Sequence, residues 1–129
     1  MRAAGTFDVK LTLQMASPEM QATQIGRMAI SKQFHGDLAA VSAGEMLALR
    51  TAVEGSAGYV AIERVTGELN GRKGGFMLQH SGTMNRGASS LVLTVIPDSG
   101  TDALAGLNGS MAIRNSDGKH TYTMEYTLP

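Results

Sequence analysis

The chain has 129 residues, 43% of them hydrophobic and 17% charged, which is typical of a single globular domain with a sizeable core. Eleven basic residues balance eleven acidic ones, and no apolar run approaches the ~20 residues of a membrane-spanning helix, so we expect neither a nucleic acid nor a membrane as a partner. There is no cysteine, which excludes disulfides, thiolate catalysis and cysteine-ligated zinc.

The N-terminal segment 1–13, "MRAAGTFDVKLTL", has the alternation of a half-buried strand. Four apolar residues point to one side, namely Phe7, Val9, Leu11 and Leu13. No apolar stretch of signal-peptide length precedes this pattern, so we expect a cytoplasmic location if Met1 is the native start.

The next segments contain one interruption and one ambiguity. Pro18 and polar residues break the pattern in 16–24, and 25–34 resumes it with Met28, Ile30 and Phe34 on one face. The alanine, methionine and leucine residues of 38–50, "LAAVSAGEMLALR", suit a helix, whereas Gly44 and the short turns at either end favour a strand. We predict a strand.

Five further strands follow, separated by turn signals. They span 59–67, 74–82, 89–97, 109–115 and 119–128. Asn70-Gly71 and Asp117-Gly118 are strong hairpin signals, because a type I′ turn requires positive φ at both central residues. Eight short strands with hardly a helix predict an all-β fold, either a sandwich or a closed barrel, as a single domain over 1–129.

The Asn70-Gly71 turn predicts which side chains share a face. If Leu69 pairs with Arg72, then Glu63 lies opposite Leu78 and Ala61 lies opposite His80. One face then carries Tyr59, Ala61, Glu63, Val65, Phe76, Leu78 and His80, and the other carries Val60, Ile62, Arg64, Met77 and Gln79.

Two later hairpins extend this interpretation. A two-residue turn at Arg86-Gly87 adds Leu91, Leu93 and Val95 to the face of Glu63 and His80, whereas a three-residue turn with a bulge changes that assignment. With Asp117-Gly118 as a turn, one face of the last hairpin carries Met111, Ile113, His120, Tyr122, Met124 and Tyr126.

Glu63 and His80 form the candidate catalytic pair. A buried carboxylate costs several kcal/mol unless it is paired, and His80 is the nearest suitable partner in this register. The pair either fixes the strand register as part of the core, or forms a site in which the carboxylate orients the imidazole for acid/base chemistry.

The same face supplies candidate ligand contacts. They are Tyr59, Phe76, Leu78 and Leu93, together with Tyr122 of the last hairpin, and each tyrosine either bonds a ligand or simply packs at the barrel rim. The three histidines lie on separate strands without ligand spacing, so we predict neither a metal site nor a cofactor.

The opposite face predicts self-association. Val60, Ile62 and Met77 would be exposed on an isolated barrel, and such patches usually mark interfaces. We therefore expect a homodimer or another homo-oligomer.

Three stretches carry a resemblance to a known family. "ERVTGELNGRKGGFMLQHSG" (63–82), "PDSGTDALAGLNG" (97–109) and "YTMEYTL" (122–128) resemble the bacterial family called domain of unknown function 3224. The resemblance implies an eight-stranded antiparallel barrel of the allene oxide cyclase or calycin type, with an apolar cavity. Val65 and Gly75 depart from the family pattern, which has an aromatic residue and a serine there.

Three functions remain open from sequence. The first is a cofactor-independent isomerase or cyclase acting on an apolar metabolite in the barrel cavity. The second is a lipocalin-like carrier or sensor of hydrophobic small molecules, and the third is a structural or interaction barrel without a ligand.

Overall fold

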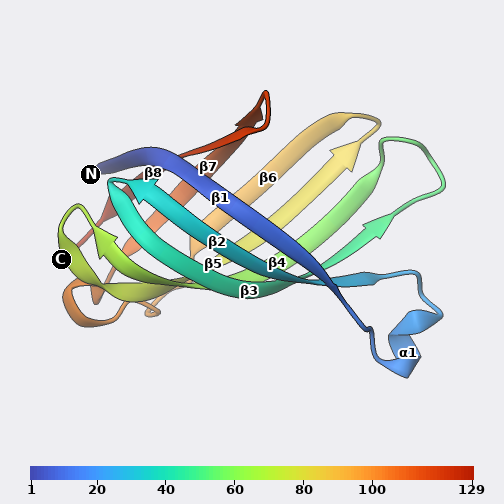
Figure 1. Cartoon of the computed structure of the whole chain (residues 1–129), viewed down its shortest axis with the longest axis horizontal. Coiled ribbons are helices and arrows are strands. Elements are labelled where there is room, and N and C mark those ends of the chain that lie inside the picture. The colour runs from blue at the N-terminus through green and yellow to red at the C-terminus, as the bar shows by residue number, and fades with distance from the viewer.

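A computed structural model describes residues 1–129 as a closed eight-stranded barrel, in which each strand is antiparallel to the next and the last pairs with the first (Figure 1). The strands are β1 (Arg2–Gln14), β2 (Gly26–Gly36), β3 (Leu38–Arg50), β4 (Ala57–Leu69), β5 (Arg72–Asn85), β6 (Ala88–Val95), β7 (Asn108–Ser116) and β8 (Lys119–Thr127). The predicted all-β fold and the strand assignment of 38–50 are confirmed, and the choice between sandwich and barrel is settled as a barrel.

Two short helices interrupt the strands. They are α1 (Pro18–Gln21), where Pro18 broke the sequence pattern, and the 3₁₀ helix η1 (Asp102–Leu104). Neither has the length and apolar character that a membrane-crossing helix needs.

The predicted hairpin registers are confirmed. Leu69 pairs with Arg72, and the Asn70-Gly71 turn between them has φ values of 49° and 83°. The turns at 86–87 and 117–118 have two central residues as well, both with positive φ, as type I′ turns require. The bulged alternative at 86–87 is therefore wrong, and Leu93 lies opposite His80.

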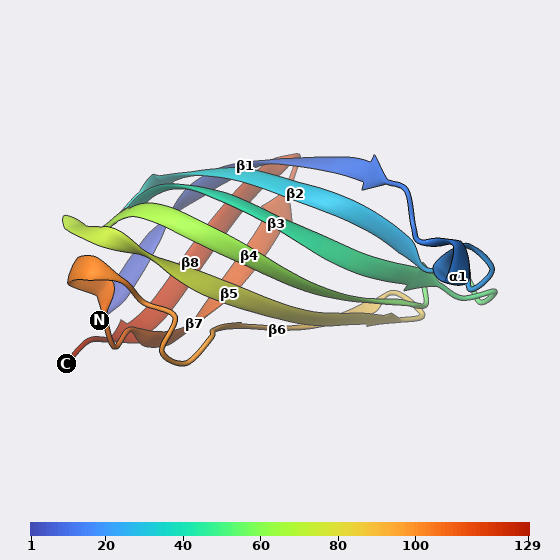
Figure 2. The ribbon, with the colours of Figure 1, turned by 90° about the horizontal axis from the view of Figure 1, so that it is seen from below.

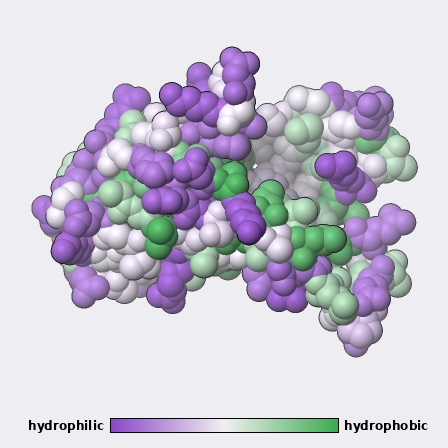
Figure 3. Space-filling view, in the orientation of Figure 1, coloured by the Kyte–Doolittle hydropathy of each residue, from purple (hydrophilic) through white to green (hydrophobic).

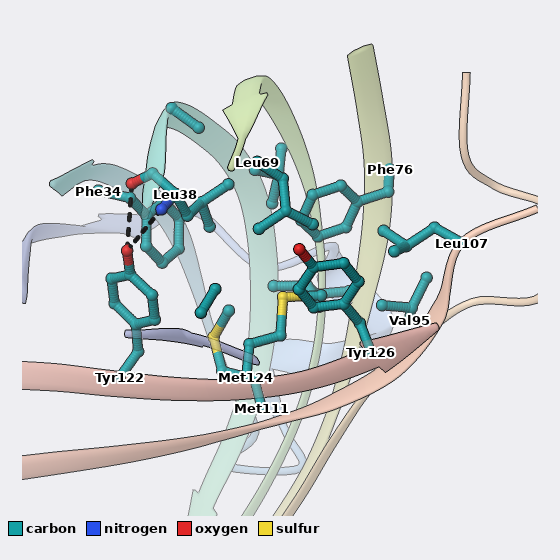
Figure 4. Close-up of a cluster of buried hydrophobic side chains, with 14 of the residues drawn as sticks. Phe34, Leu38, Leu69, Phe76, Val95, Leu107, Met111, Tyr122, Met124 and Tyr126 are labelled. Carbon is teal, nitrogen blue, oxygen red and sulfur yellow. Dashed lines mark hydrogen bonds between the residues drawn. The ribbon is translucent and has the colours of Figure 1, made fainter. Parts of the chain in front are cut away.

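The core fills one end of the barrel. Both chain termini lie at this end, and η1 and its flanking residues cover it (Figure 2). Figure 4 shows Tyr122 among the buried side chains, with its hydroxyl directed at the backbone of Leu38. This hydroxyl accepts from the Leu38 N–H (2.9 Å) and donates to the His35 carbonyl (2.9 Å). The closed end is thus an ordinary packed core.

The opposite end is open. Along β1, Leu11 and Leu13 lie on the face that is buried at Phe7, yet they are 49% and 74% exposed. β6 and β7 pair only through Thr94 and Ser110, so the barrel wall is open between the rest of these two strands. Figure 3 shows a hollow in the surface between the β7–β8 hairpin and the β5–β6 turn.

Candidate functional site

The register places the inner side chains of β3 to β6 in rows across the barrel. The outermost row, the rim row, consists of Arg50, Ala57, Met84 and Ser89. Below it come the row of Ala48, Tyr59, Gly82 and Leu91, the row of Met46, Ala61, His80 and Leu93, and the row of Gly44, Glu63, Leu78 and Val95. Half of the residues in the two outer rows are small, namely Ala48, Ala57, Gly82 and Ser89, and most residues of the two inner rows are buried.

A pocket of about 360 Å³ lies at the open end, and we call it the mouth pocket. Its apolar lining includes Met46, Leu49, Met84, Leu91 and Ile113. Tyr59 lies against Gly82, where an added Cβ would come 2.5 Å from the tyrosine ring. Ala48 and Ala57 also leave space beside this ring, so small residues around one aromatic side chain create the pocket.

Tyr59 connects the mouth pocket to buried polar side chains. Its hydroxyl lies 3.1 Å from His80 Nδ1, and His80 Nε2 lies 2.5 Å from Glu63 Oε2. The same carboxylate oxygen accepts a hydrogen bond from Lys32 Nζ at 2.9 Å. We call Lys32, Glu63, His80 and Tyr59 the polar chain.

Burial and neighbouring charges determine which groups of the polar chain carry a proton. Burial favours a higher pKa for the Glu63 carboxyl, but the His80 hydrogen bond and the Lys32 charge outweigh it and lower this pKa from 4.5 to about 2. An ionised carboxylate only accepts hydrogen bonds, so His80 Nε2 is the donor. Burial, with the Glu63 charge adding to it, raises the pKa of Tyr59, which keeps its phenol protonated.

Lys32 is the member of the polar chain that the sequence analysis missed. Its ammonium lies 2.9 Å from Glu63 and 5.0 Å from the centre of the Phe7 ring, so an ion pair and a cation–π contact both stabilise it. A signal was present, because Lys32 occupies the next inward position after Met28 and Ile30. A lysine on an otherwise apolar face predicts a buried counter-charge.

The other predicted ligand contacts lie away from the mouth pocket. Phe76 and Leu78 belong to the packed core, and the Tyr122 hydroxyl is occupied by backbone groups at the closed end. Leu93 is buried in the row of His80, below the pocket. Side chains fill the interior at these depths, so Tyr59 is the predicted contact that reaches the pocket.

Glu63 is poorly suited to act as a base near neutral pH. A carboxyl group with a pKa of about 2 is ionised at neutral pH, and its carboxylate takes up a proton only in acid. Its oxygen Oε2 already binds two donors, while Oε1 is buried without a hydrogen-bond partner. The polar chain is therefore better suited to holding Tyr59 in one orientation than to accepting a proton from a ligand.

Comparison with known proteins places this architecture in a family. The model of a family of proteins of unknown function, DUF3224, matches residues 3–126. A crystal structure of a DUF3224 protein of unknown function from Shewanella oneidensis MR-1 is 47% identical, with a TM-score of 0.93, and the match covers 100% of this chain and 98% of that one. No curated protein matches the sequence. The chain therefore belongs to the DUF3224 family.

Proposed function

We propose that the protein binds a small apolar molecule in the mouth pocket and acts as a carrier or sensor of it. The apolar pocket around the Tyr59 ring is the observation that carries this proposal. Its volume lies within the range typical of small-molecule sites. The anchored Tyr59 hydroxyl offers one polar contact at a fixed position, and such preorganisation lowers the entropic cost of binding.

A second candidate is an isomerase or cyclase of the allene oxide cyclase type. The contact between Tyr59 and His80 favours it, because a phenol that touches the ligand can exchange a proton with the imidazole behind it. In this version Tyr59 is the catalytic residue, and Glu63 only orients His80. Burial raises the pKa of Tyr59, which makes proton loss from its phenol harder, so this candidate is weaker than the carrier, which needs no proton transfer.

The binding proposal is tested by filling the pocket. Ala48 lies opposite Tyr59 and lines the mouth pocket, whereas Ala43 on the same strand lies on the outer face. We expect the neutral fluorescent probe N-phenyl-1-naphthylamine to bind the native protein saturably, and Ala48→Phe to weaken this binding about tenfold or more. Ala43→Phe should bind like the native protein, and circular dichroism checks that both variants fold.

The outcomes separate the candidate functions. Equal binding by both variants would place the probe elsewhere and refute the mouth pocket. Absence of saturable binding to the native protein would favour a barrel without a ligand. Mass spectrometry follows whether a bound metabolite is converted. If the native protein converts it and Tyr59→Phe does not, the protein is an isomerase rather than a carrier.

A further inference from the structure

Arg50 occupies an unusual position at the mouth pocket. It is the last residue of β3 and lies in the rim row, on the inner face of the barrel. Of the 14 residues that line the pocket, Arg50 is the one with a charged side chain, and none is acidic. The guanidinium is exposed to water at the rim, and a negative charge brought beside it would form an ion pair.

No side chain of the protein supplies that charge. Arg50 takes part in none of the six ion pairs, whereas Arg2 and Arg27 pair with Glu125 and Glu45 on the outer surface. Glu54, in the turn that follows β3, does not line the pocket. The guanidinium is therefore available to a ligand.

Below the pocket lies a closed ion pair, and neither of its members lines the pocket. Glu63 lies two rows below Tyr59 and carries a negative charge, and Lys32 lies one row deeper still, opposite Ser42. Glu63 lies between the pocket and Lys32 and already pairs with it, so the inner end offers an anionic group no free cation. A ligand with one anionic end is therefore oriented with that end at the rim.

We propose that the natural ligand is an apolar monocarboxylic acid, whose carboxylate pairs with Arg50 at the rim while its hydrocarbon body fills the mouth pocket toward Tyr59. The planar guanidinium matches a carboxylate through two parallel hydrogen bonds, and this geometry favours a carboxylate over other head groups. The inference rests on the proposed binding function and adds the chemical class of the ligand.

Three probes with one chain and different head groups test the proposal. Decanoate, 1-decanol and decyltrimethylammonium, each below its critical micelle concentration, displace N-phenyl-1-naphthylamine from the native protein. We expect decanoate to bind about tenfold more tightly than decanol, as a charge-assisted hydrogen bond predicts, and the ammonium probe to bind most weakly. Added salt should weaken only the decanoate complex.

Variants then assign the effect to Arg50. Arg50→Gln should lower the affinity for decanoate about tenfold and leave decanol unchanged, because it removes the charge and keeps a polar, though shorter, side chain. Arg50→Lys should retain part of the preference. Arg64→Gln, on the outer surface of β4, is the matched control and should bind all three probes like the native protein.

The result separates this inference from the proposed function. If decanol and decanoate bind equally well and Arg50→Gln changes neither, the mouth pocket binds apolar molecules but the carboxylate inference is overturned. If none of the three probes displaces the fluorescent probe from the native protein, the proposed binding function fails as well.

Discussion

At the residue scale, the molecule is organised by three ionisable side chains inside an apolar barrel. Lys32, Glu63 and His80 are each buried, and Glu63 Oε2 accepts hydrogen bonds from both of the others. Buried ion pairs stabilise little relative to apolar residues, but removal of one partner leaves an uncompensated charge. Their arrangement separates the packed core from the mouth pocket.

Replacement of Glu63 should therefore be much more damaging than replacement of a surface glutamate. We expect Glu63→Gln to lower the free energy of unfolding by about 3–5 kcal/mol, because Lys32 keeps its charge without a counter-ion. Glu45→Gln, which breaks the exposed pair with Arg27, should change stability little. Urea unfolding measures both variants.

The double variant Lys32→Met with Glu63→Gln supplies the check. It removes both charges, so it should recover much of the stability that Glu63→Gln loses. If the double variant is as unstable as Glu63→Gln alone, the loss comes from packing rather than from the uncompensated charge.

The low pKa of Glu63 also predicts a pH dependence. Its pKa is about 2 in the folded protein and near 4.5 in an ordinary carboxyl, so the group stabilises the fold fully above pH 4.5. This contribution, about 3 kcal/mol, should be lost as the pH falls from about 5 toward 2. Unfolding free energies measured from pH 7 to pH 3 test this, and the Lys32→Met, Glu63→Gln variant should show a shallower decline.

At the element scale, glycine residues allow strands to approach closely where large side chains enter the barrel. Gly44 on β3 lies opposite Glu63 on β4, and an added Cβ at Gly44 would lie 2.6 Å from Glu63 Cα. A side chain at this position would push the two strands apart. Gly44 thus helps to position the polar chain.

Gly44→Ala should destabilise the protein by about 1–3 kcal/mol, because the neighbouring backbone has to shift. Gly26→Ala on β2 is the matched control, since its added Cβ would meet the Ala48 carbonyl oxygen at an ordinary 3.7 Å. We expect the control to stay within about 0.5 kcal/mol of the native protein. Equal thermal denaturation midpoints for the two variants would contradict the close approach.

At the scale of the whole molecule, the outer surface carries an apolar row across β3 to β6. The register aligns Leu47, Val60, Ser81 and Val92, and Ile62 lies beside Val60 on the same face. Val60, Ile62 and Val92 are 52%, 48% and 59% exposed. Met77, which the sequence placed in the same exposed patch, is instead half-buried, and Ser99 and Ile96 form hydrogen bonds with its backbone.

This apolar row is the surface through which we expect two copies to associate. Sedimentation at micromolar concentration should show a species heavier than the 13.5 kDa of one chain. Val60→Lys should shift it to the monomer, because association would bury the new charge. Val41→Lys, at an exposed valine outside the row, should leave it unchanged. A native protein that sediments only at 13.5 kDa would refute this expectation.

The sequence predicted much of the fold and part of the site. The two-residue turns fix the register of neighbouring strands, so the shared face of Glu63 and His80 followed from Asn70-Gly71 alone. The strand assignment of 38–50 rested on Gly44 and the flanking turns, and the pairing of β3 with strands on both sides confirms it. Strand register and strand assignment could be predicted because turn geometry and side-chain alternation act over a few residues.

Only the tertiary structure decided which side chains meet across the interior and how far the interior is filled. Lys32 reaches Glu63 although 31 residues separate them, because the curvature of β2 to β4 brings their inner faces together. The packed closed end removes Phe76, Leu78 and Tyr122 from the site, and the small residues Ala48, Ala57 and Gly82 at the open end leave space beside Tyr59. The barrel closes through the pairing of β1 with β8, and no local sequence pattern specifies this long-range contact. Closure determines both which side chains meet across the interior and how far the interior is filled.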